Sequence, residues 1–329
     1  MSSVVFAEDA NLYRGDVPIS SREQAAVNEA VASALAQVLV RISGDNQVPL
    51  SSAGQALLQQ ANRYMLSYTF LDADPIQLAV QFDETRLRQA LQSAGLPLWG
   101  ANRPQTVHWL TSDTGGVIQT DSSPLADTIH HQAQLRGLPH LLPLYDLEDS
   151  MRVSATDISG NFSLPVIAAS ERYDASFVLL TSILPVGSQW RYQYYLYRAI
   201  YEDNAPKVVA SGNGLADSEA IAVAEVLDQI GQFYGQRYAA VLSAEPDTLQ
   251  LQIGIPGGFF QLMQLERYLG GLSAVESIQI HAVQNNVVTM ELQLLSEATE
   301  LERAFRLEPR LSKLPPTDDI AADYQWDDR

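Results

Sequence analysis

The sequence contains no cysteine, and this absence excludes several chemistries at once. A chain without thiols forms no disulfide, holds no iron–sulfur cluster or cysteine zinc site, and has no thiolate nucleophile. The absence does not decide the compartment, because periplasmic proteins can also lack cysteine.

Basic residues are scarce as well. The chain has 20 lysines and arginines against 39 acidic residues, which gives a net charge of −19. Lys207 and Lys313 are its only lysines. A surface this acidic repels phosphate backbones and anionic membrane faces, so we predict no nucleic-acid partner. The simplest role of the acidity is to keep the protein soluble.

Long apolar runs are also missing. No stretch approaches the roughly 20 apolar residues that span a bilayer, so we predict a chain that is not membrane-spanning. Hydrophobic residues make up 46% of the sequence and charged residues 18%, which is a globular composition. A chain of 329 residues is too long for one ordinary core, so two or three domains are expected.

Hydrophobic periodicity predicts an α+β fold built from three small mixed α/β domains. Residues 10–100 follow the order β-α-α-β-β-α. The first helix of this domain begins after a capping-box pattern, Ser20 and Glu23, and ends at Gly44. The pattern therefore predicts an N-terminal domain that ends near residue 100.

Residues 101–245 form the predicted central α/β domain. Its apolar stretch 176–184 is expected to be a strand buried on both faces, and 217–242 a long helix. Residues 247–310 follow β-α-β-β-α, the order of a ferredoxin-like plait. The acidic tail 311–329 is expected to be disordered.

The N-terminal residues Val5, Phe6 and Ala7, followed by Glu8, read like the end of a signal peptide. We therefore predict a periplasmic protein whose leader is absent or truncated in this chain. An ordinary frayed N-terminus is the alternative.

Three segments resemble one known family: residues 38–45, 95–104 and 142–149. The second segment, GLPLWGANRP, is the most specific. Together they resemble the Gram-negative envelope family named domain of unknown function 2066, which implies a secreted or periplasmic protein and carries over no catalytic residue. The element order of the central block also resembles the α/β domains of envelope proteins such as the amino-terminal domain of TolB.

Metal and nucleophile signatures are weak. His130 and His131 are neighbours on a predicted helix, with His140 nearby in sequence, and adjacent helical side chains point too far apart to share a metal. Ser170 and Ser182 lack the G-x-S-x-G elbow of a hydrolase. We predict no metal and no cofactor.

An acidic cluster follows the predicted strand at 141–144: Asp146, Glu148 and Asp149. Paired carboxylates serve glycoside hydrolysis. The same residues could form a cation or ligand site through Asp146 and Asp149. They also suit a helix start, where Asp146 would act as the cap.

The junction near residue 100 offers a second candidate site through Trp99, Asn102 and Arg103. Trp99 could stack on a ligand ring while Arg103 binds a carboxylate. Alternatively, the segment is a structural latch in which Trp99 is buried and Arg103 pairs with an acid of the next domain.

The strand that starts at Trp190 has two different faces. Trp190, Tyr192, Tyr194 and Leu196 should point into the core. The opposite face, which is typical of a protein interface, carries Arg191, Gln193, Tyr195 and Tyr197. This face is either open or covered by the helix 217–242.

These features predict a non-enzymatic envelope protein that acts as a protein-interaction or assembly module. Its expected partner is an envelope protein, with cell-wall polymer as a second ligand class. The alternative is a hydrolase of wall glycan or peptide that uses acids such as Asp146 and Asp149. An apolar cleft holding two carboxylates of raised pKa would favour the hydrolase, and an exposed aromatic patch would favour binding.

Overall fold

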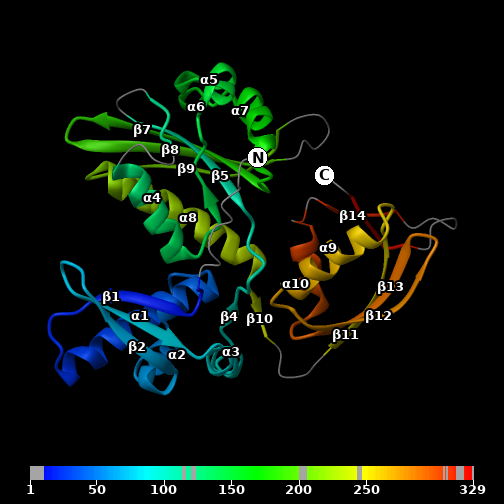
Figure 1. Ribbon diagram of the computed structural model, residues 1–329, viewed down its shortest axis with the longest axis horizontal. Helices are drawn as coiled ribbons and strands as arrows, with labels where there is room; N and C mark the ends of the chain where they lie inside the picture. The colour runs from blue at the N-terminus through cyan, green and yellow to red at the C-terminus, as the bar shows by residue number, and fades with distance from the viewer. Residues whose placement is uncertain are drawn as a thin grey trace. The chain divides into compact units, whose positions relative to one another are not determined.

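The computed structural model describes residues 11–112, 116–119, 124–199, 206–242, 247–306, 308, 310–315 and 322–327. These residues divide into two compact units, coloured by residue number in Figure 1. Among the described residues, unit 1 comprises 103–233, and unit 2 comprises 11–102 together with 234–327. Both units combine helices and sheets, which confirms the α+β fold class.

The first part of unit 2 has the predicted order β-α-α-β-β-α. Its elements are β1 (Arg14–Pro18), α1 (Gln24–Ser43), α2 (Ser52–Leu58), β2 (Met65–Leu71), β3 (Gln77–Phe82) and α3 (Glu84–Ser93). The strands form an antiparallel sheet in the order β1-β3-β2. Leu78, Val80 and Phe82 of the central strand are buried in one core with the apolar face of α1.

Helix α1 is the one described helix that is long and apolar enough to cross a membrane by length and composition. The apolar character of α1 is accounted for by its packing, because Val31, Leu35 and Val38 are completely buried in the core of unit 2. The predicted capping box at its start is wrong, since Glu23 itself occupies the N-cap position and makes no side-chain capping bond. The predicted end at Gly44 is confirmed by its left-handed backbone.

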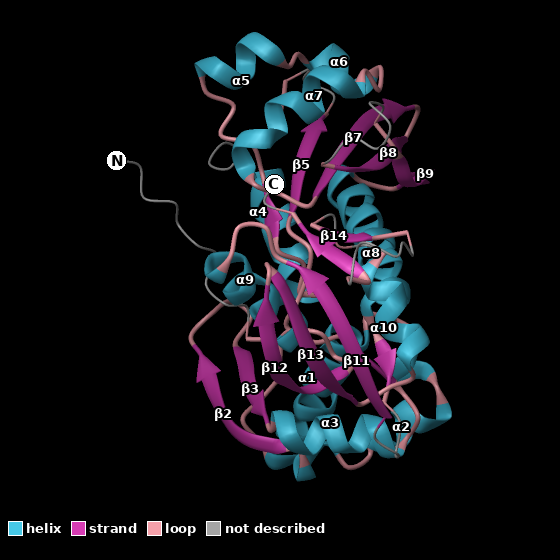
Figure 2. Ribbon diagram, turned by 90° about the vertical axis from the view of Figure 1, so that its right-hand side faces the viewer, coloured by secondary structure: helices cyan, strands magenta, loops and turns pink. Residues whose placement is uncertain are grey.

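The second part of unit 2 contains the predicted order β-α-β-β-α. Its elements are β11 (Asp247–Gly254), α9 (Phe259–Gly270), β12 (Val275–Gln284), β13 (Val287–Leu294), α10 (Ala298–Phe305), β14 (Leu311–Lys313) and β15 (Tyr324–Trp326). The sheet order is β12-β13-β11-β15-β14, and Figure 2 shows β12, β13 and β11 side by side. Strand β15 lies parallel to β11, where a plait would place an antiparallel fourth strand, so the ferredoxin-like detail is not confirmed.

The predicted disorder of the tail is wrong for residues 311–315 and 322–327. Strands β14 and β15 pair with each other, and Trp326 is completely buried against Tyr268. The segment is rich in aspartate, but it also contains two aromatic residues, Tyr324 and Trp326, on either side of Gln325. That short alternation supplies enough apolar surface to join the core.

Unit 1 is a sheet with helices on both faces (Figure 1). Its strands are β5 (Thr106–Thr111), β6 (His140–Leu141), β7 (Phe177–Val186), β8 (Gln189–Arg198) and β9 (Val208–Ala216), in the order β6-β5-β7-β8-β9. Strands β6, β5 and β7 are parallel, and β8 and β9 continue the sheet antiparallel. The helices are α4 (Pro124–Arg136), α5 (Leu147–Arg152), α6 (Ala155–Ser159), α7 (Ser163–Ser170) and α8 (Glu219–Tyr238).

The two faces of this sheet have different helices. Tyr192 and Tyr194 of β8 hydrogen-bond to Gln229, which places α8 on their face. The helices α5–α7 share a core with the opposite face through Trp109, Val178 and Leu180. Within α8, Ile221 is exposed although the sequence pattern placed it in the apolar row.

A short antiparallel pair, β4 (Pro97–Leu98) and β10 (Ala240–Val241), belongs to unit 2. It joins the segment before residue 102 to the segment after residue 234, which are far apart in the sequence. The division between the units therefore falls inside α8, after Phe233.

Candidate functional site

The acidic cluster lies at the start of α5, where Asp146 is the N-cap. Its side chain accepts a hydrogen bond from the backbone N–H of Asp149 at 3.2 Å. Both carboxylate oxygens also accept from the Arg172 guanidinium, at 2.8 and 2.9 Å. The hydrogen bonds from Arg172 and then from the Asp149 N–H hold the pKa of Asp146 at about 2.

Asp149 is completely buried beneath this cap. One oxygen accepts from the Tyr145 N–H at 3.0 Å and from the Tyr173 hydroxyl, and the other accepts from Arg172 at 3.2 Å. Burial and the hydrogen bond to Asp149 raise the pKa of the Tyr173 hydroxyl, so it stays a donor at neutral pH. A buried carboxylate with this many donors is a structural tie between α5 and the segment after α7.

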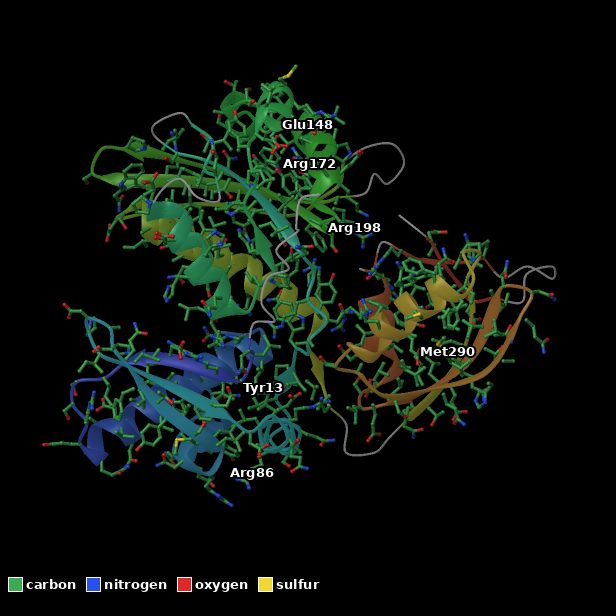
Figure 3. The ribbon with its side chains drawn as sticks, in the orientation of Figure 1. Tyr13, Arg86, Glu148, Arg172, Arg198 and Met290 are labelled. Atoms are coloured by element: carbon green, nitrogen blue, oxygen red, sulfur yellow. The ribbon has the colours of Figure 1, made fainter. Side chains whose placement is uncertain are left out.

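Glu148 lies at the solvent side of the same cluster, and Figure 3 labels it next to Arg172. It pairs with Arg152 at 3.2 Å and lies 3.8 Å from Arg172. The cluster therefore ties α5 to the segment that follows α7. A general acid for glycoside hydrolysis needs a raised pKa, whereas the pKa of Asp146 is lowered.

A histidine pair lies inside unit 1 and includes a residue that sequence reasoning missed. The Nδ1 atom of His108 is 2.9 Å from Nε2 of His140, and Nε2 of His108 is 2.7 Å from the Thr181 hydroxyl. Burial, reinforced by nearby His130, lowers the pKa of His140 to about 3, and burial also lowers that of His108. His108 is an inward residue of β5 in an apolar run, and that position was its only sequence signal.

His130 and His131 are exposed on α4. Within the described ranges, no group of three or more His, Cys, Asp or Glu side chains is arranged to hold a metal ion.

Trp99 is buried in unit 2, at 1% exposure. Its ring stacks on Tyr238 at 6.3 Å and packs against Tyr234 at 6.2 Å. A Cβ at Gly44 would lie 2.4 Å from the backbone of Gly235, so glycine is needed where these segments meet. Trp99 is therefore buried, as the latch alternative predicted, and its enclosed ring leaves no face for stacking on a ligand.

Asn102 and Arg103 make different contacts. Asn102 donates from its amide to the Tyr268 carbonyl at 3.2 Å, and its N–H donates to the Gly271 carbonyl at 3.1 Å. Arg103 belongs to unit 1, where its guanidinium donates to the carbonyls of Arg136 and Gly137 at the end of α4. These are carbonyls that a helix end leaves without helical partners, so Arg103 caps α4, a role that the sequence did not predict.

The predicted face of β8 is open at one end and covered at the other. Arg191 and Gln193 are exposed and Tyr195 is half-buried, but Tyr197 is only 3% exposed. The Tyr197 hydroxyl donates to Asn161 at 2.8 Å, in the turn between α6 and α7. Tyr197 is therefore not part of an open face, because α5–α7 cover it. The sequence pattern had suggested only the helix 217–242, which corresponds to α8, as a possible cover.

The pairing of β8 with β7 and β9 places further residues beside the open end of this face. Arg191 faces Leu184 of β7 and Leu215 of β9, which are 41% and 53% exposed. Gln193 faces Ser182 and the exposed Asn213 in the next row. We call this set the open face: Leu184, Arg191, Gln193, Asn213 and Leu215. The prediction that 176–184 is buried on both faces is wrong at Leu184, because α5–α7 end before they reach it.

Two family models match parts of the chain. Residues 257–325 match DUF2066, which confirms the resemblance to that family, and residues 7–100 match a domain of unknown function, DUF8605. The DUF2066 match lies in the second part of unit 2, away from the three segments on which the resemblance was based. The comparison with curated proteins finds no match.

Solved structures give weak similarities. The LpoB C-terminal domain from Salmonella enterica is 16% identical, with 36% of this chain and 85% of that chain covered and a TM-score of 0.25. TolB from Acinetobacter baumannii is 8% identical, with 49% and 35% covered and a TM-score of 0.24. A formyltetrahydrofolate deformylase from Pseudomonas putida is 12% identical, with 68% and 91% covered and a TM-score of 0.16. Scores this low do not establish a shared fold, and we infer no function from them.

Proposed function

We propose that this chain is a non-enzymatic protein of the cell envelope, and that the open face of unit 1 binds a partner protein. The observation that carries the proposal is the row Leu184–Arg191–Leu215, in which a guanidinium lies between two exposed leucines on adjacent strands. Arginine is enriched among the residues that contribute most to protein–protein binding, and apolar neighbours around such a residue exclude water from the contact.

The strand at the centre of the open face, β8, is also held in place by contacts on the opposite side of the sheet. The other side of the same strands carries the buried residues Tyr192 and Tyr194, which are fixed by Gln229 of α8. A partner would therefore meet a rigid sheet, and little ordering entropy would be lost on binding. The neighbouring helices α5–α7 form a step beside the open face, because they cover Tyr197 but not Arg191.

The engaged state of the acidic residues argues against the hydrolase alternative. Asp146 caps α5 and pairs with Arg172, while Asp149 is occupied by three donors. The pKa of Asp146 is lowered and Asp149 is buried among its donors, so neither is poised as a general acid. Binding explains the open face, whereas hydrolysis would leave it without a role.

The envelope location rests on the DUF2066 match over residues 257–325 and on the leader-like residues Val5–Ala7. Fractionation of cells that express the natural gene tests it. Recovery in the periplasmic fraction is expected, and a purely cytoplasmic pool would refute the envelope assignment.

The interaction is tested by placing a photo-crosslinking amino acid at Gln193 or Asn213 in cells that express the chain at natural levels. We expect one discrete crosslinked partner from both positions, identified by mass spectrometry. The purified partner is then titrated against the chain and against Arg191→Glu. Because Arg191 is exposed, this change should weaken binding without lowering the melting temperature.

A matched control places the same crosslinker at Val283, an exposed residue of β12 in unit 2. This position should not give the partner band. Equal crosslinking at Val283 and Gln193, or unchanged affinity of Arg191→Glu for the purified partner, would remove the open face from the proposal.

A further inference from the structure

Strand β2 is an edge strand with few of the features that normally protect an edge. In the described part of the chain it pairs only with β3, at the end of the order β1-β3-β2, and Figure 2 shows it there. Its sequence, Met-Leu-Ser-Tyr-Thr-Phe-Leu, contains no charge, proline or glycine. Natural edges are usually blocked by lysine, proline or bulges, and β2 has only a bulge between Met65 and Ser67.

The exposure of β2 is as unusual as its composition. Four consecutive residues, Leu66 to Thr69, are exposed, with Leu66 at 60% and Tyr68 at 41%. Successive strand residues point to opposite faces, so both faces are open along this stretch. A strand added at this edge would meet no covering helix from the described residues.

The pairing register shows what such a strand would continue. Tyr68 faces Val80 and Phe70 faces Leu78, and both partners are core residues against α1. The rings of Tyr68 and Phe70 lie edge-to-face at 5.8 Å. An added strand with apolar residues opposite these rings would extend the core face of the sheet past its present edge.

Charges at the two ends of β2 indicate which strand fits. The exposed Arg63 precedes the strand, and the exposed Asp72 and Asp74 follow it. Arg63 ends the 3-10 helix Ala61–Arg63 just before the strand, so an antiparallel pairing of two copies centred on Tyr68 brings the Arg63 end of one copy near the Asp72 and Asp74 end of the other. Each end then brings opposite charges together, which favours this register.

The side chains between these ends also match. Beyond the bulge at Leu66 the pairing is regular: Ser67 faces Thr69 of the other copy and Tyr68 faces Tyr68, so no like charges lie opposite each other. This matters for a chain with a net charge of −19, because most other surfaces of two copies repel. The edge of β2 is a neutral strip whose ends are self-complementary.

We propose that β2 is a self-association edge: a second copy of this chain adds its own β2 antiparallel, and the two three-stranded sheets become one continuous sheet about a twofold axis. This is strand addition, with the backbone groups of the edge supplying affinity and the Arg63–Asp72/Asp74 contacts supplying register.

Sedimentation velocity of the full chain over a range of concentrations tests the proposal. We expect a reversible monomer–dimer equilibrium. Tyr68→Lys places two ammonium groups opposite each other at the twofold axis, and the dimer dissociation constant should rise about tenfold or more. Thr69→Lys, at an exposed position whose side chain points to the other face of the strand, serves if Tyr68→Lys melts early.

A charge-swap series separates this pairing from other contacts. Arg63→Asp alone should weaken the dimer, and Arg63→Asp combined with Asp72→Arg and Asp74→Arg should restore it. A chain that stays monomeric at every concentration overturns the proposal. So does a dimer that Tyr68→Lys and Thr69→Lys leave intact, or one that the combined swap fails to restore.

Discussion

The two units of this protein use different kinds of interior. The cores of unit 2 are built from apolar side chains, such as Leu35 against Val80 in one part and Leu265 with Met290 in the other. Unit 1 places a hydrogen-bonded set within its sheet and helices: the His140–His108–Thr181 chain, Asp149 with its donors, and Trp109 Nε1 donating to Ser170 at 2.8 Å.

This difference indicates what each unit is sensitive to. An apolar core depends on volume, because a truncated side chain leaves a cavity. A buried polar network depends on every partner being present and in the right protonation state. Unit 2 should therefore respond most to changes of side-chain size, and unit 1 to loss of a partner and to pH.

The largest expected effect is in unit 2. Trp99→Ala removes a buried ring from its contacts with Tyr234 and Tyr238, which should cost about 3–5 kcal/mol. Hydrogen exchange read peptide by peptide should show lost protection in 11–102 and 247–306. Trp190→Ala, at a half-buried position in β8, is the control and should cost less. An equal response from both variants would mean that Trp99 is not a core residue.

Unit 1 should respond most to loss of a buried partner. Asp149→Ala leaves the Tyr173 hydroxyl and the Tyr145 N–H without their acceptor, at a cost of about 2–3 kcal/mol. Chemical denaturation of the variant measures this. Glu171→Ala, one residue from Arg172 and exposed, should be neutral. A stable Asp149→Ala would show that the network is dispensable and would weaken the contrast between the units.

The third expected effect is that low pH destabilises unit 1 more than unit 2. The pKa of His140 falls from 6.5 unfolded to about 3 folded, so the unfolded chain takes up the proton first as pH drops. Unit 1 therefore loses stability below pH 6.5, by about 1.4 kcal/mol per pH unit for this group, until pH reaches the folded pKa. The lowered pKa of His108 acts in the same direction.

This acid sensitivity is measured by hydrogen exchange of unit 1 peptides at several pH values between 6.5 and 4. Protection should fall as pH falls, and His140→Gln should flatten the dependence. Peptides from α1 and β3 of unit 2 are the internal reference. A slope that His140→Gln leaves unchanged would place the acid sensitivity elsewhere.

Helix caps should give the smallest effects, and similar ones in both units. The Ser154 side chain accepts from Asp157 N–H at the start of α6, and the Ser51 side chain accepts from Gly54 N–H at the start of α2. Ser154→Ala and Ser51→Ala should each cost about 1 kcal/mol. Thermal melts of both variants check this. A much larger loss for one of them would show that its helix matters more to the core than its length suggests.

Local patterns in the sequence predicted most elements of this fold. The alternation along β8 correctly separated the buried Tyr192 from the exposed Arg191, and Gly44 was correctly predicted to end α1. These features depend on neighbours within one turn or one strand. Such local features can therefore be predicted from the sequence alone.

Features that depend on pairing between distant segments were not predictable in this way. The row Leu184–Arg191–Leu215 exists only because of the register of three strands. The burial of Tyr197 depends on Asn161, and the His108–His140 contact on two parallel strands. The candidate face was thus half predicted, since its strand was found but its neighbours and its limit were not.

The position of β15 between β11 and β14 determines when this sheet can be completed. Ile253 of β11 pairs with Tyr324, and β15 separates β11 from β14. During synthesis, the edge of β11 that faces β15 stays unpaired until residues 324–326 have emerged, and an unpaired strand edge is open to wrong partners. A chaperone that holds the nascent chain would be needed longest at this point.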